Sequence, residues 1–196
     1  MNYKEEIEYR KILYNRATKG EKLTKEERFW AATHRSYNKI KGYSFLNIDI
    51  IELQPKGKYY VTVRIEKINY PNRFSPIFSV PGGKGLILTD YNITDYNGKI
   101  SPPKPIKMLG FSDLSENDKK GFHYVSGLGL MGISFQCDYY DPKHRLHLRQ
   151  SSDTGNPSFA MLREDLSENK VLYRCKPPFN DDFDSFVFSV EWCPEH

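Results

Sequence analysis

Three glycines in the middle of the chain spell the pattern G-x-G-x-x-G, which in many proteins cradles the pyrophosphate of a dinucleotide. They are Gly127, Gly129 and Gly132. That use requires a strand before the pattern and a helix after it, because the helix N-terminus holds the pyrophosphate. Here residues 133–137 alternate apolar and polar side chains, as in a strand. The sequence therefore favours glycines that let a strand bend or bulge.

A second glycine-rich stretch, Pro81-Gly82-Gly83-Lys84-Gly85, could present backbone N–H groups and an ammonium group to an anion. It lacks the spacing and the Ser/Thr of a Walker A loop. It also lies between two apolar segments, so a plain hairpin turn is the alternative. Three glycines exceed what a turn needs, and we therefore predict that Gly82, Gly83, Lys84 and Gly85 bind a ligand.

The triplet Asp153-Thr154-Gly155 matches the active-site triplet of aspartic proteases, which bring two carboxylates together. Such a triplet normally follows an apolar strand, whereas Ser151 and Ser152 precede it here. The chain holds no second triplet, so a second copy of the chain would have to supply it. A turn built on Asp and Gly is the simpler interpretation.

Two groups of side chains could bind metal ions. His144 and His147 have Asp138 and Asp141 nearby, but residues three apart on a strand face opposite sides of the sheet. The run 180–184 offers carboxylate oxygens without the twelve-residue pattern of a calcium loop, and we expect a solvated acidic loop. The sequence thus predicts no metal site and no cofactor.

Nucleophilic catalysis has no local signature in this chain, because the G-x-S-x-G elbow is absent. A hydrolase would need His123, His144 or His147 to meet an acidic residue in a pocket. We therefore expect a non-enzymatic protein. A small hydrolase or ligand-processing enzyme, with residues converging from several strands, is the alternative.

The elements that must position these residues are mostly strands. Apolar and polar residues alternate over 46–50 and again over 61–66, and the turn Pro55-Lys56-Gly57 between them predicts a β-hairpin. Further strands are predicted at 77–80, 86–89, 91–96, 106–111, 122–126, 132–140, 146–150, 158–163, 171–175 and 186–192. Many short strands with turns between them predict a mainly β fold, an antiparallel β-sandwich or open barrel.

The first 41 residues differ from the rest and predict two short helices. Ile12 and Leu13 lie among charges in residues 3–16, and Thr24 with Glu27 forms a capping box that starts the second helix. That helix places Phe29 and Ile40 on one stripe and is expected to stop near residue 42. We predict one domain over 1–196, with a helical segment 1–41 and a β-rich body 42–196. Residues 101–105, rich in proline, are the alternative boundary.

The two ends of the chain carry opposite charge. Residues 1–41 hold eleven Lys/Arg and six Asp/Glu, a net charge of +5, and residues 177–196 hold five Asp/Glu and no Lys/Arg. The ends could attract each other, or the basic end could meet an acidic partner. We predict that Trp30, Arg35 and Tyr37 face such a partner, with burial of both aromatic rings as the alternative. The same side chains could instead bind phosphates and stack bases of a nucleic acid.

Three widely spaced cysteines, Cys137, Cys175 and Cys193, match neither a disulfide framework nor a zinc pattern. There is no apolar run long enough to span a membrane, and no signal peptide is visible. We therefore expect a soluble cytoplasmic protein with reduced thiols and no membrane partner. Our leading hypothesis is an intracellular, non-enzymatic binding module that recognises another macromolecule, a protein. The enzyme and the nucleic-acid-binding protein are the alternatives.

Overall fold

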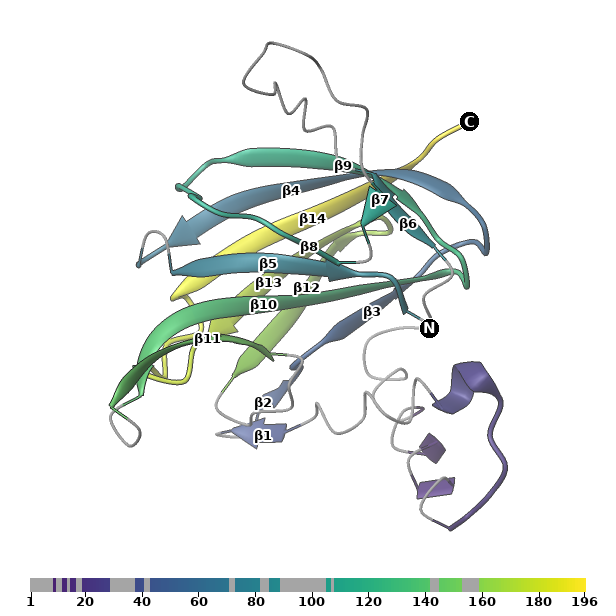
Figure 1. Cartoon of the computed structure of the whole chain (residues 1–196), viewed down its shortest axis with the longest axis horizontal. Helices are drawn as coiled ribbons and strands as arrows, with labels where there is room; N and C mark the ends of the chain where they lie inside the picture. The colour runs from purple at the N-terminus through teal and green to yellow at the C-terminus, as the bar shows by residue number, and fades with distance from the viewer. Residues whose placement is uncertain are drawn as a thin grey trace.

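The computed structural model describes residues 9, 12–13, 15–16, 19–28, 38–40, 43–70, 73–81, 85–88, 105–106, 108–141, 145–152 and 159–196. Two antiparallel sheets face each other across one core, as Figure 1 shows. The predicted antiparallel β-sandwich is confirmed. No helix in this part of the chain is long and apolar enough to cross a membrane.

The five-stranded sheet is centred on β10 (Leu130–Asp141). One edge of β10 pairs with β5 (Phe74–Ser79), which in turn pairs with β8 (Met108–Gly110). The other edge pairs with β3 (Asp49–Glu52) near the start of β10 and with β11 (Leu146–Ser151) near its end. β3 and β11 therefore follow one another along the same edge.

The seven-stranded sheet has strand order β12-β13-β14-β4-β9-β6-β7. Its bounds are β12 (Ala160–Ser167), β13 (Lys170–Lys176), β14 (Phe186–Pro194), β4 (Lys58–Ile68), β9 (Lys119–Val125), β6 (Leu86–Leu88) and β7 (Pro105–Ile106). A separate ribbon joins β1 (Asn38–Ile40) and β2 (Tyr43–Phe45). Strands on either side of residues 101–104 pair within both sheets: β5 with β8, and β6 with β7, which begins at Pro105.

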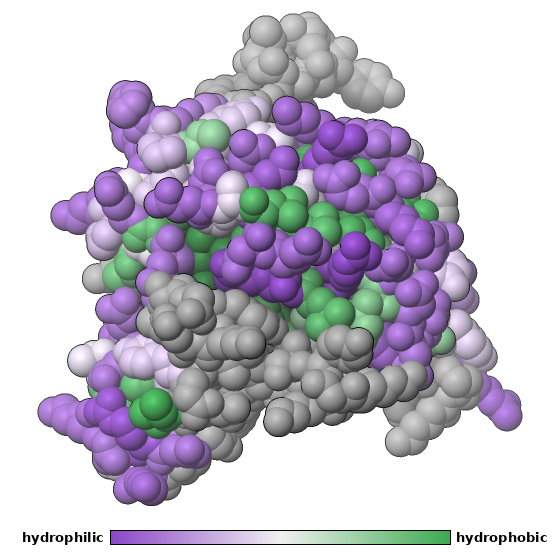
Figure 2. Space-filling model, turned by 180° about the vertical axis from the view of Figure 1, so that it is seen from behind, coloured by the Kyte–Doolittle hydropathy of each residue, from purple (hydrophilic) through white to green (hydrophobic). Residues whose placement is uncertain are grey.

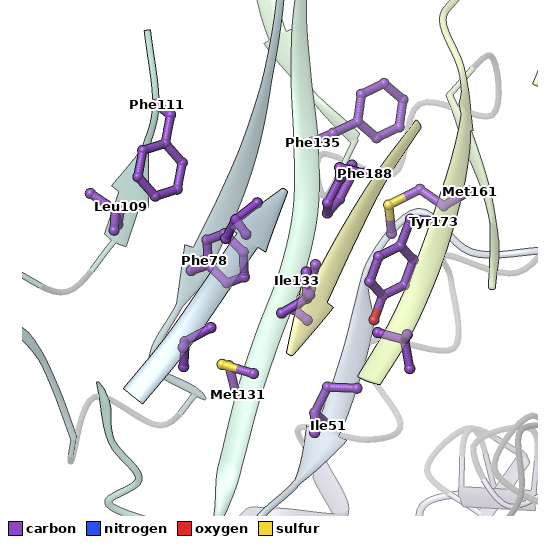
Figure 3. Packing of buried hydrophobic residues seen from close by; sticks show 14 of the residues in the cluster. Ile51, Phe78, Leu109, Phe111, Met131, Ile133, Phe135, Met161, Tyr173 and Phe188 are labelled. Atoms are coloured by element: carbon purple, nitrogen blue, oxygen red, sulfur yellow. The ribbon is translucent and has the colours of Figure 1, made fainter. Parts of the chain in front are cut away.

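The core consists of the inward-facing side chains of both sheets, and aromatic rings dominate it. In Figure 3, Ile133 and Phe135 of β10 lie near Phe188 of β14 and Tyr173 of β13. Rings from the two sheets also meet directly: Phe74 stacks on Phe186 with centroids 5.1 Å apart. Such ring pairs add about 0.5–1.5 kcal/mol beyond the area they bury.

The cysteines are free thiols in two environments. Cys137 and Cys175 are buried in the core, whereas Cys193 is exposed. Burial raises the pKa of Cys137 to about 12 and the pKa of Cys175 well above its ordinary value. Thiols that hold their proton so firmly are poor nucleophiles and poor metal ligands.

The predicted hairpin over residues 46–66 is wrong. The turn exists, with the Gly57 N–H donating to the Gln54 carbonyl (3.0 Å), but it carries the chain from one sheet to the other. β3 pairs with β10, whereas β4 pairs with β14 and β9. The preceding alternation is also broken by a bend at 47–48, so that Leu46 packs in the main core and Ile50 in a second cluster. Alternation reports burial, but not the identity of the pairing strand.

The N-terminal segment packs at one end of the sandwich, beside β3 (Figure 1). Leu13 and Leu23 join Ile50 of β3 and Leu130 of β10 in the second buried cluster. Residues 9, 12, 13, 15 and 16 are helical, within the predicted first helix, and residues 25–28 are helical, in agreement with the predicted start of the second. The predicted start of the first helix at residue 3 lies outside the described residues.

The predicted capping box is confirmed, whereas the predicted end of the second helix is wrong. The Thr24 N–H donates to Glu27 Oε2 (2.8 Å), and the Glu27 N–H donates to Thr24 Oγ1 (3.1 Å). Residues 29–37 lie outside the described residues, and Asn38–Ile40 form strand β1, paired with β2. The β-branched Ile40 and the aromatic residues of 43–45 favour this pairing over a helix.

Candidate functional site: a groove at one end of the sandwich

One end of the sandwich is closed by aromatic rings. Phe179, in the loop between β13 and β14, is 39% exposed and lies over the first part of β5. Its ring meets those of Tyr70, Phe74 and Tyr139 at centroid distances of 5.4, 6.5 and 6.5 Å. Aromatic rings therefore cover the core at the end where β14 begins.

The other end, where β14 finishes, holds a groove of about 770 Å³. We call it the Trp192 groove. Its apolar lining comes from Leu53, Pro55, Tyr59, Trp192 and Pro194. Its lining includes residues of β3 from one sheet and of β4 and β14 from the other. The groove therefore lies where the two sheets separate.

The strand pattern explains why Trp192 and Tyr59 are at this position. Alternate residues of β14 face the core, and Trp192 is the last of them; on β4, Tyr59 is the first. Only 8% of Trp192 and 6% of Tyr59 is exposed, so each ring packs on the core with one side and offers an edge to the groove. The Tyr59 hydroxyl accepts a hydrogen bond from the Gln54 N–H (2.9 Å), which fixes the 54–57 turn beside it. The indole N–H of Trp192 has no acceptor within the described part of the chain.

Two exposed carboxylates, Glu52 and Glu168, also line the Trp192 groove. Neither forms an ion pair within the described residues, whereas the nearby Glu191 pairs with Lys170 at 3.7 Å. No Lys or Arg is among the described residues that line the groove. The groove therefore joins an apolar floor to an uncompensated negative charge, which attracts cations.

Gly129 lies in a tightly packed turn behind the groove. Gly129 has a φ of +77°, and a Cβ there would lie 2.6 Å from the Leu53 carbonyl oxygen. The residue that follows, Leu130, begins strand β10, so no helix follows the G-x-G-x-x-G pattern. The predicted strand after the pattern is confirmed, whereas only Gly132 lies within it; Gly127 and Gly129 lie in the bend between β9 and β10.

Of the predicted ligand loop, the structure describes only Gly85. A Cβ at Gly85 would lie 2.2 Å from the Val125 carbonyl oxygen and 2.8 Å from the Gly127 nitrogen. Gly85 is thus needed for close packing on the β9–β10 turn, at the same end of the sandwich as the Trp192 groove. Gly82, Gly83 and Lys84 lie outside the described residues, and their ligand role stays a prediction.

The predicted partner-binding residues Trp30, Arg35 and Tyr37 also lie outside the described residues, so the proposed acidic partner stays a prediction. The described acidic side chains at the C-terminal end pair with the sheet instead. Asp181 lies 3.2 Å from Lys176, and Asp184 pairs with Arg174. The run 180–184 is a loop of local hydrogen bonds and ion pairs, as expected of an acidic surface loop.

The described histidines do not line either of two pockets formed by the described residues. His123 of β9 contacts Glu195 (2.8 and 3.0 Å from Nδ1 to the two carboxylate oxygens) and packs edge-on against Tyr60. His147 is exposed on β11, in the other sheet, while His144 and residues 153–155 lie outside the described residues. None of the three described histidines, His123, His147 and His196, lines the Trp192 groove. Among the described residues no three side chains are grouped to hold a metal ion.

A fully buried carboxylate ties the two sheets together. Asp49 of β3 accepts hydrogen bonds from the Tyr173 hydroxyl (2.6 Å) and from Arg163 Nη1 (3.1 Å). Burial and then the Asp49 charge raise the pKa of Tyr173. Burial alone would lower the pKa of Arg163, but the facing Asp49, Tyr173 and Asp165 raise it overall. Tyr173 therefore keeps its proton and Arg163 keeps its charge, and both tie β3 to the opposite sheet through Asp49.

Sequence reasoning missed the residues of the Trp192 groove. Trp192 ends a strand that was predicted correctly, but its place at the open end follows from where β14 stops relative to β3. Glu52 and Glu168 stand in ordinary polar surroundings in the sequence and meet only in the fold. The one available signal was the aromatic residue at the inward position nearest the strand end.

Comparisons with known proteins add little. No family model matches the chain, and no curated protein matches it. Among solved structures, the C-terminal domain of BC2L-C lectin from Burkholderia cenocepacia is similar over 74% of this chain and 94% of that chain, at 12% identity and a TM-score of 0.33. A likeness this weak carries no argument about function.

Proposed function

We propose that this chain is a protein-binding module that holds a basic, extended segment of a partner protein in the Trp192 groove. The observation that carries the proposal is the combination of an apolar floor with two unpaired carboxylates and no lining cation among the described residues. Its volume, about 770 Å³, is within the range of specific binding sites.

Lysine and arginine side chains suit both parts of this groove. Their methylene stems pack on apolar surface while the charged head stays in a polar setting. The heads would meet Glu52 and Glu168, and the aromatic rings of Trp192 and Tyr59 favour a nearby cation. Seen from behind in Figure 2, the described surface is mostly hydrophilic, with hydrophobic side chains gathered in the middle of that face.

A hydrolase with two carboxylates is less consistent with the groove. Glycosidases keep one carboxyl group protonated by placing it in an apolar pocket, and use the other as nucleophile or base. Glu52 and Glu168 are both exposed, so neither has the environment of a general acid. The groove is therefore better suited to binding than to catalysis.

Calorimetry with charged peptides tests the proposal. The probes are an alternating Lys-Ala peptide and a matched Glu-Ala peptide. We expect the Lys-Ala peptide to bind and the Glu-Ala peptide not to bind. The double variant E52Q/E168Q should weaken binding at least about tenfold, which corresponds to about 1.4 kcal/mol.

The control is E116Q/E164Q, which removes the same charge from two exposed glutamates outside the groove. It should change affinity less than about twofold. If both double variants weaken binding equally, the peptide senses only net charge and the groove is not the site. Failure of the Lys-Ala peptide to bind wild type would also refute the proposal.

A further inference from the structure

A second concavity, of about 330 Å³, lies on the outer face of the five-stranded sheet. Its polar lining consists of Arg73, Ser75, Ser112, Asp113, Gln136 and Arg149. We call it the polar pocket. It shares no lining residue with the Trp192 groove, so what it binds is independent of the proposed function.

Strand register brings these residues to one face. Ser75 of β5 is directly opposite Gln136 of β10, and Arg149 of β11 is opposite Asp138, two residues further along β10. On β8, Gly110 is opposite Ile77, two residues from Ser75. The intervening residues of β10 and β5 face the core, so this face points outward. Gly110 adds no side chain, and the face is hollowed there.

One cation of the polar pocket is held by the protein itself. Arg149 donates to Asp138 through Nε (2.7 Å) and Nη2 (2.8 Å), a two-point contact that raises the pKa of Arg149. This pair is close to neutral, and Arg149 lines one side of the pocket. Gln136, beside it, has a side-chain amide with no partner in the described part of the chain.

The other two charges of the polar pocket are unpaired. Arg73 has no carboxylate within ion-pair distance in the described residues, and its guanidinium lies 5.9 Å from the ring centroid of Tyr70. Asp113, held in a turn with φ of +53°, has no ion-pair partner there either. Because the two line the same pocket without pairing with each other, opposite charges face a shared space.

We propose that the polar pocket binds a small zwitterion, a free α-amino acid. Its carboxylate would pair with the guanidinium of Arg73, whose N–H groups suit two-point contact with a carboxylate. Its ammonium would pair with Asp113, and Gln136 with Ser112 would add neutral hydrogen bonds. A simple anion would be repelled by Asp113, and a simple cation by Arg73. The volume matches a ligand of a few heavy atoms rather than a chain.

NMR titration of the isotope-labelled chain with the twenty standard α-amino acids, one at a time, tests the proposal. We expect at least one of them to shift the signals of the polar-pocket residues to saturation. The tightest one is then compared with its N-acetyl form, which lacks the ammonium, and its amide form, which lacks the carboxylate. Each loss should weaken binding at least about tenfold.

Two variants and their controls separate the two charges. R73Q should weaken binding of the amino acid tenfold or more but leave binding of its amide form unchanged. D113N should weaken binding of the amino acid by a similar factor but leave binding of its N-acetyl form unchanged. The control variants R64Q and D165N, on other strands, should not change the affinity for the amino acid. The groove variant E52Q/E168Q should not change it either. Equal binding of the N-acetyl form would show an anion site and overturn the proposal. Failure of all twenty amino acids to bind would overturn it as well.

Discussion

Asp49 shows how a single side chain can hold the two sheets in place. Its carboxylate is fully buried, and its partners Tyr173 and Arg163 belong to the opposite sheet. A third hydrogen bond, from the Ile50 N–H to Asp49 Oδ1 (2.8 Å), fixes the rotamer. A buried charge that loses its partner is costly, so this network contributes to the choice of one sheet packing over others.

Replacing Asp49 should therefore destabilise the fold strongly. We expect D49A to lower the free energy of unfolding by about 3–5 kcal/mol, because Tyr173 and Arg163 lose their buried acceptor. The matched control is D165A, which removes the exposed partner of the same arginine and should cost about 0–1 kcal/mol. Urea denaturation measures both. Equal effects of the two variants would show that burial of Asp49 contributes nothing.

At the scale of residues, burial could be predicted only in part. Position 49 was expected to be a solvent-facing member of an alternating strand, and it proved to be buried. The bend at 47–48 changes the phase of the alternation, and the partners lie 114 and 124 positions away in the sequence. No local pattern reports such contacts.

Among the elements, the turn that leads into β10 depends on a glycine. Gly129 has positive φ, and its missing side chain allows the backbone of Leu53 to approach: the Leu53 N–H donates to the Gly129 carbonyl at 2.7 Å. Because Leu53 lines the Trp192 groove, this turn also sets the position of one groove wall.

Gly20 provides a control for this turn, since it has a similar φ of +79° but no neighbour within 4 Å. G20A should cost only the left-handed backbone conformation, about 1–2 kcal/mol. G129A should cost about 1–3 kcal/mol more, because its Cβ would overlap the Leu53 carbonyl. Thermal and urea unfolding compare the two variants. If G129A is no more harmful than G20A, the turn adjusts freely and the close approach is unimportant.

Strand positions were well predicted because half-buried strands leave a period of two in the sequence. Every predicted strand that falls on described residues has a counterpart, whereas residues 91–96 lie outside them. Pairing was not predictable: residues 49–52 and 58–68 follow each other closely, yet they belong to different sheets. A short turn permits a hairpin but does not require one. Hydrophobic contacts with strands that are distant in the sequence determine which strands pair.

For the whole molecule, buried phenols predict sensitivity to alkali. Burial raises the pKa of both Tyr124 and Tyr173. Each keeps its proton in the fold above pH 10, where the unfolded chain loses it, so stability is complete below about pH 10 and falls as pH rises toward the folded pKa values. The expected slope is about 1.4 kcal/mol per pH unit for each such tyrosine.

Phenolate absorbance, followed together with circular dichroism, tests this. At least two of the fourteen tyrosines should ionise only as the strand signal disappears. If all fourteen ionise while the strand signal is intact, these rings are not sealed in the core.

Binding in the Trp192 groove has one further consequence: a basic ligand must contact Trp192. The chain has two tryptophans, so W30F leaves Trp192 as the sole source of indole fluorescence. Titrating W30F with the Lys-Ala peptide should change the Trp192 emission in a saturable way, with the midpoint found by calorimetry. An emission that stays constant while calorimetry shows binding, or a loss of binding in W30F, would place the site elsewhere and contradict the account.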